Sequence, residues 1–130
     1  MIKNNKPNDL SKPHYAFAGT HFIANYEQCD LDALINLDEL KINMIKSVVA
    51  SGATVLTIAS HVFEPNGITM AIVLSESHAT IHTYPEVQSC FVDLFTCGDR
   101  CSYELFDQTL RKYLKPQLTK THIINRGTKE

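Results

Sequence analysis

The chain has 130 residues, which suits a single domain able to bury about two-thirds of the surface that its unfolded form exposes. It carries 12 Lys and Arg against 14 Asp and Glu, a net charge of −2, and 44% of its residues are hydrophobic. This composition excludes a disordered chain, and the absence of a basic block or a long apolar run argues against nucleic-acid and membrane partners. We expect a cytoplasmic protein whose four cysteines are free thiols.

The chain divides into a leader and one domain. Residues 1–18 are polar and contain two prolines, so we expect a loose N-terminal leader. Residues 19–130 contain no linker, repeat or low-complexity tract, so we expect them to form one domain.

Hydrophobic periodicity predicts six strands and two main helices. The expected strands are residues 20–26, 54–63, 68–74, 80–83, 89–96 and 118–124. The expected helices are residues 30–51, with a capping-box-like pair at Asn36 and Glu39, and a second helix that Ser102 caps and Pro116 ends. Residues 64–67 fit a hairpin turn. This order predicts an α+β two-layer sandwich, an antiparallel-rich sheet with two main helices packed on one face, whose other face is solvated or meets a partner.

Reactive side chains concentrate between residues 75 and 101, where a metal site is the first chemistry to consider. His78 and His82 are four apart and would share one face of a helix, but the segment is rich in β-branched residues. Cys97 and Cys101 lack the short paired spacing of zinc ribbons. We therefore expect no metal site, and read both histidines as ordinary polar residues at a strand end.

Two covalent chemistries also fit the segment. Ser77 lacks the Gly-x-Ser-x-Gly pattern of hydrolases, whereas Cys97 beside a histidine would suit thiol chemistry, although a lone cysteine is usually a small buried hydrophobe. In the other chemistry, the hydroxyl of a serine attacks the preceding carbonyl, and the resulting ester breaks down to a pyruvoyl group. Spacing alone supports the thiol chemistry weakly and ranks the serine chemistry lowest, because Glu-Ser pairs are common.

A family resemblance changes this ranking. The segment LSESHATIHTYPE at residues 74–86 closely resembles the self-cleavage and active-site motif of the short prokaryotic S-adenosylmethionine decarboxylase proenzymes. The similarity runs in order from residue 19 to residue 127, and it includes FEPNG at 63–67, DLFTCG at 93–98, GTH at 19–21, YEQCD at 26–30 and NRG at 125–127.

The resemblance implies a self-cleaving, pyruvoyl-dependent enzyme. The chain would cut itself between Glu76 and Ser77, and Ser77 would become a covalent pyruvoyl group that forms a Schiff base with the substrate amine, without metal or pyridoxal phosphate. His82 matches the base that removes the serine α-proton from the ester, and Thr69 matches a hydroxyl residue that assists processing. Cys97 matches the proton donor to the substrate carbon, a role that suits a thiol because an ordinary pKa of ~8.5 keeps it protonated at neutral pH.

The same resemblance implies where the substrate binds. Phe63 matches an aromatic residue that stacks on adenine, Tyr84 an aromatic substrate contact, and Glu86 the acid that holds the ribose hydroxyls. Without the motif, Phe63 and Tyr84 would be read as core packing and Glu86 as a solvated loop acid. The family takes these groups from both subunits of a dimer, so a homodimer is expected.

Four departures from the family pattern flank the pocket. Thr69 replaces the family's usual serine, Met70 a common glycine, and Tyr84 a frequent tryptophan. Residues 87–90 differ from the family's usual Gly-Tyr-Ala stretch. The expected activity is decarboxylation of S-adenosylmethionine to the aminopropyl donor for spermidine synthesis. The alternatives are a pyruvoyl-dependent arginine or ornithine decarboxylase on the same scaffold, and an unprocessed binding or regulatory homologue.

Overall fold

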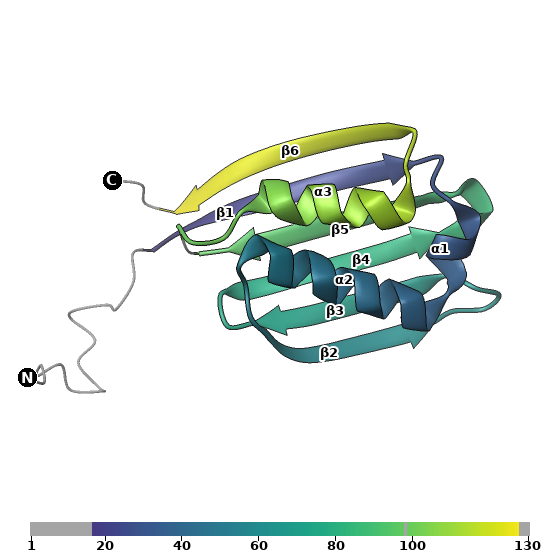
Figure 1. The fold of residues 1–130 in the computed structure, drawn as a ribbon, viewed down its shortest axis with the longest axis horizontal. Coiled ribbons are helices and arrows are strands. Elements are labelled where there is room, and N and C mark those ends of the chain that lie inside the picture. Colours follow the sequence, from purple (N-terminus) through teal and green to yellow (C-terminus); the bar gives the residue numbers. More distant parts are fainter. Residues whose placement is uncertain (1–16, 98, 128–130) are drawn as a thin grey trace, which may run out of the picture.

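A computed structural model describes residues 17–97 and 99–127 as one antiparallel sheet covered by helices (Figure 1). The six strands are β1 (Ala18–Glu27), β2 (Val55–Val62), β3 (Ile68–Leu74), β4 (Ser77–Tyr84), β5 (Ser89–Thr96) and β6 (Leu118–Gly127). The helices are α1 (Leu31–Ile35), α2 (Leu37–Ser51), α3 (Tyr103–Leu114) and the 3₁₀ turn η1 (Pro85–Val87). The strand order is β2-β3-β4-β5-β1-β6, and each neighbouring pair is antiparallel.

The predicted fold class is confirmed, with two differences in the elements. The helix expected over residues 30–51 is broken at Asn36, whose side chain accepts a hydrogen bond from the Glu39 amide at 3.0 Å and so begins α2 as a new helix. The short strand expected over residues 80–83 is instead the eight-residue β4, beginning at Ser77. Its polar first residues belong to the sheet because β4 pairs with β5 along its whole length and with β3 from Ser77 to His82.

The core lies between the sheet and the helices, and it follows the alternation of the strands. Alternate residues of β1, β3, β4 and β5 point toward α2 and α3 and are buried, while their neighbours are more exposed. Phe22 is 2% exposed and Phe106 is fully buried, and their ring centroids lie 6.1 Å apart. Their contact joins β1 to α3.

The opposite face of the sheet is left without a covering layer in the described chain, since α2 and α3 lie on the same side (Figure 1). It carries apolar side chains that a solvated face does not need: Val73, Tyr84, Phe91 and Ile124 are 48%, 42%, 51% and 44% exposed. We call this surface the open face. None of the helices in the described ranges is long and apolar enough to cross a membrane. Residues 1–16 of the predicted leader lie outside the described residues.

Candidate active site

The predicted cleavage bond lies in the tight turn between β3 and β4. Leu74 and Ser77 are paired, so Ser75 and Glu76 form a two-residue turn, and Ser77 is the first residue of β4. The φ angle of Ser77 is 154°, a backbone conformation that residues with a side chain rarely adopt. Backbone strain is therefore located at the residue whose peptide bond is expected to break.

Three hydrogen bonds hold this turn in place. The Ser75 amide donates to the Thr54 carbonyl at 3.0 Å, and the Thr54 amide donates to the Glu76 carboxylate at 3.0 Å. This bond from Thr54 holds the pKa of Glu76 below its ordinary value. The Cys97 amide donates to the Glu76 carbonyl oxygen at 3.2 Å, so a hydrogen-bond donor already faces the carbonyl of the predicted cleavage bond. We call Glu76, Ser77 and Cys97 the turn cluster.

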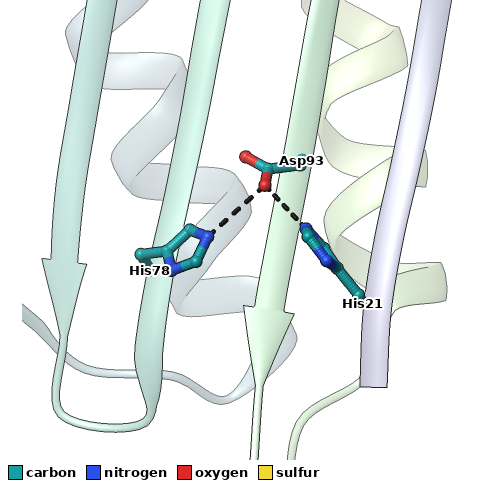
Figure 2. A group of neighbouring side chains, drawn as sticks. All are labelled: His21, His78 and Asp93. Atoms are coloured by element: carbon teal, nitrogen blue, oxygen red, sulfur yellow. Dashed lines mark hydrogen bonds and ion pairs between the residues drawn. The ribbon is translucent and has the colours of Figure 1, made fainter. Parts of the chain in front are cut away.

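Next to the turn cluster, Asp93 of β5 lies between two histidines from the adjacent strands (Figure 2). Oδ2 of Asp93 lies 2.7 Å from Nε2 of His21 and 3.4 Å from Nε2 of His78. Its other oxygen, Oδ1, accepts a hydrogen bond from the Thr80 hydroxyl. Burial by itself raises the pKa of Asp93, but the hydrogen bonds from Thr80 and His21 outweigh it and leave that pKa below its ordinary value.

His21, His78 and Asp93 also present donor atoms within 4.8 Å of one another, as a metal site would. Their hydrogen bonds supply a simpler account. Arg126 Nη1 lies 3.3 Å from Nδ1 of His21, and because a guanidinium can only donate, that nitrogen is the acceptor. The proton of a neutral His21 ring is then on Nε2, where it is donated to Asp93. A metal would need that nitrogen without its proton.

The predicted substrate residues line a second feature, a cavity of about 740 Å³ at the other end of β4. Phe63, Thr69, His82, Tyr84 and Glu86 all lie on its wall. Phe63 and Tyr84 are 50% and 42% exposed, which excludes the core-packing interpretation. Thr69 Oγ1 lies 3.1 Å from Nδ1 of His82, so the two residues predicted to act in processing are in direct contact.

The structure does not bring all the predicted residues together within one chain. Ser77 and His82 stand at the first and sixth positions of β4, which separates them by about 16 Å at the usual ~3.3 Å per residue. The turn cluster and the cavity are thus two half-sites at opposite ends of one strand.

Sequence reasoning missed part of the site beside the turn. It placed His21 and Asp93 in family motifs but gave them no role, and it read His78 as an ordinary polar residue. One signal was present: Asp93 is an acid in the alternating strand 89–96, flanked on its own face by Phe91 and Phe95. A carboxylate at such a position usually has a partner.

Comparisons with known proteins point to one family. The profile of the S-adenosylmethionine decarboxylase family matches residues 20–127. The S-adenosylmethionine decarboxylase proenzyme of Fervidobacterium nodosum is 39% identical over 106 residues, covering 82% of this chain and 76% of that protein. The S-adenosylmethionine decarboxylase proenzyme of Methanococcus maripaludis is 38% identical over 109 residues, covering 84% of this chain and 89% of that protein. The crystal structure of the adenosylmethionine decarboxylase from Aquifex aeolicus superimposes with a TM-score of 0.81 at 26% identity, covering 88% of this chain and 95% of that one. The chain therefore belongs to the S-adenosylmethionine decarboxylase family.

Proposed function

We propose that the chain cuts itself between Glu76 and Ser77 and then decarboxylates S-adenosylmethionine. Its relatives are named S-adenosylmethionine decarboxylase proenzymes, which supports processing and this substrate. The observation that carries the proposal is the turn cluster. A strained serine follows a carbonyl that already accepts a hydrogen bond from the Cys97 amide. A hydroxyl next to a polarised carbonyl in a strained turn is what an acyl shift from nitrogen to oxygen requires.

The residues of the turn cluster fit a covalent pyruvoyl group made from Ser77. Once formed, that group would supply a carbonyl that takes up the substrate amine and accepts the electrons released with carbon dioxide. Cys97 is exposed and follows Thr96, the residue paired with Ser77, so its thiol is in a position to return a proton to the substrate carbon.

The separation of the half-sites supports a homodimer of cleaved protomers. His82 of one chain is too far from its own Ser77 to remove a proton there, so it would act on the turn cluster of a second copy. The open face offers the surface for such a pairing, because apolar side chains from β3, β4, β5 and β6 are exposed on it. Each active site would then combine the turn cluster of one protomer with the cavity of its partner.

The cavity suits an adenosine-bearing cation. The Phe63 ring is free to stack on a base, the Glu86 carboxylate can accept hydrogen bonds from ribose hydroxyls, and aromatic faces attract a sulfonium. Arginine or ornithine would need an acid facing a distal cation, and would make less use of Phe63. Measuring the release of carbon dioxide from S-adenosylmethionine, arginine and ornithine decides the substrate.

Four free cysteines support the predicted cytoplasmic location.

Intact mass under denaturing conditions tests the self-cleavage. We expect two fragments, residues 1–76 and 77–130, the second lighter than a serine-initiated fragment by one molecule of ammonia. A chain that stays whole on long incubation would contradict the proposal and favour an unprocessed binding homologue. A Ser77→Ala chain is the matched control and should stay uncut.

A further inference from the structure

The proposed self-cleavage needs a base that the cavity does not provide within the same chain. Before any ester forms, the Ser77 hydroxyl must lose its proton to become a nucleophile. His82 is assigned to the later step, removal of the α-proton from the ester, and it lies about 16 Å away along its own β4. A group of the same chain that lies beside Ser77 can serve the first step and leave the His82 of the second copy for the later one.

His78 is that group by position. Its Nδ1 lies 3.4 Å from Oγ of Ser77, and its Nε2 lies 3.4 Å from Oδ2 of Asp93. In a regular strand, consecutive side chains point to opposite faces and would not meet. The φ of 154° at Ser77 breaks this regularity, and it accompanies the approach of the hydroxyl to the ring of the next residue.

The contacts around the His78 ring favour the tautomer that a base needs. A carboxylate attracts an N–H and cannot donate, so the proton is favoured on Nε2 of His78, which lies 3.4 Å from Oδ2 of Asp93. Nδ1 is then unprotonated and faces the Ser77 hydroxyl. Thr80 and His21 also donate to Asp93, which fixes the position of the carboxylate. The Phe95 ring packs against both histidines, with centroids 5.3 Å from His21 and 5.7 Å from His78.

We propose that His78 is the general base for the nitrogen-to-oxygen acyl shift at Ser77, and that Asp93 positions its ring. The arrangement has the logic of a serine, histidine and aspartate triad, in which the acid orients the imidazole and stabilises its charged form. The inference rests on the proposed self-cleavage and assigns its first step. His78 and His82 would then serve two successive steps, the first from the same chain and the second from the partner.

The step balances within the chain. Nδ1 of His78 takes the proton from the Ser77 hydroxyl while Oγ forms a bond to the carbonyl carbon of Glu76. The Cys97 amide, already 3.2 Å from that carbonyl oxygen, donates to the negative charge that develops there. The bond from this carbon to the Ser77 nitrogen then breaks, and the imidazolium returns its proton to the leaving nitrogen. The product is an ester between Glu76 and Ser77, with no co-reactant.

The test compares the stage of self-cleavage at which His78→Gln and His82→Gln stop. Hydroxylamine cuts esters but leaves ordinary amide bonds intact, so it reveals whether the ester has formed. We expect His78→Gln to slow self-cleavage by about 100-fold or more, the usual contribution of a general base, and to remain whole in hydroxylamine. His82→Gln should stop later and be cut by hydroxylamine. His122→Gln, a histidine of the outer strand β6, should be cleaved like the parent chain.

Each outcome bears on the proposal. A His78→Gln chain that is cleaved at the parent rate, or that accumulates a hydroxylamine-sensitive ester, would overturn it. Circular dichroism checks that the variant folds; if it does not, His78→Ala is followed with and without imidazole, which can enter because the His78 side chain is 42% exposed. Imidazole should restore cleavage, and a folded chain that it does not restore would also overturn the assignment. If the parent chain itself is never cleaved, the proposed function fails instead.

Asp93 has its own readout as a positioning residue. Asp93→Asn should slow the same step and again leave no ester, because the amide no longer holds the Nε2 proton of His78 in place. Asp93→Glu keeps a carboxylate and should recover part of the rate. Equal rates for the two variants would show that the charge at this position does not act through His78.

Discussion

A chain that cannot process itself should be rescued by another defective chain if each site spans two protomers. Ser77→Ala removes the nucleophile from the turn cluster, and His82→Asn removes the histidine from the cavity. These residues lie about 16 Å apart on one strand, so no single chain reunites them. In a mixed dimer, however, the intact Ser77 of one chain meets the intact His82 of the other.

The size of the rescue follows from the pairing. Random association of two chains in equal amounts makes about half of the dimers mixed, and each mixed dimer has one intact site of two, or about a quarter of the parent activity. The two chains are co-expressed with different tags, and their masses and the release of carbon dioxide from S-adenosylmethionine are measured. Only the His82→Asn chain should be cleaved, since only that chain keeps Ser77.

The matched control pairs Ser77→Ala with Cys97→Ser. Both changes lie in the same turn cluster, so every mixed site lacks either the serine or the thiol, and no recovery of carbon dioxide release is expected. The Cys97→Ser chain keeps Ser77 and the Cys97 backbone amide, so carbon dioxide release and not cleavage is the readout of this control. Efficient cleavage of the His82→Asn chain by itself, or the absence of rescue in purified mixed dimers, would refute the division of the site between protomers.

Three further results are expected. Phe63→Ala should lower kcat/KM for S-adenosylmethionine by about tenfold or more, from the loss of base stacking, with little change in self-cleavage; unchanged kinetics would remove Phe63 from the pocket. Phe106→Ala, in an uncleaved Ser77→Ala background, should lower the free energy of unfolding in urea by about 3–5 kcal/mol because its ring is fully buried, and a loss below about 1 kcal/mol would contradict that packing. In the same background the low pKa of Asp93 means that its stabilisation is present above the ordinary value of about 3.9 and is lost as pH falls through the folded-state pKa. The free energy of unfolding in urea should therefore fall at acid pH, and Asp93→Asn should flatten that dependence. A pH profile that Asp93→Asn leaves unaltered would contradict the stabilising role of the Asp93 carboxylate.

Much of the fold could be predicted because the local signals agree with the tertiary structure. Alternation over residues 68–74 and 89–96 coincides with β3 and β5. The signals were weaker at the start of β4, where Ser77 and His78 do not look like strand residues. Pairing with β3 and β5 places them in the sheet, and a pairing between distant strands is not visible in a local pattern.

The candidate site was predicted unevenly for a similar reason. A contiguous motif marked Ser77 and His82, and neighbouring motifs marked Phe63 and Cys97. These motifs could not show that the set divides into two half-sites. That division follows from the length of the extended strand β4, which separates Ser77 from His82. Nor could the motifs show the grouping of His21 with Asp93, which are 72 positions apart and meet only through the register of β1 with β5.

The amino-acid sequence by itself determined the chemistry available to this protein: a serine after a glutamate, a thiol, and aromatic and acidic groups for a nucleoside. Tertiary structure alone decided which of these groups can act on one another. It strains Ser77, places the Cys97 amide on the scissile carbonyl, and brings His78 and Asp93 beside the nucleophile while His82 stays distant. The physical reason is that proton transfer requires contact at hydrogen-bond distance, and contact between residues far apart in the chain is set by strand order and register.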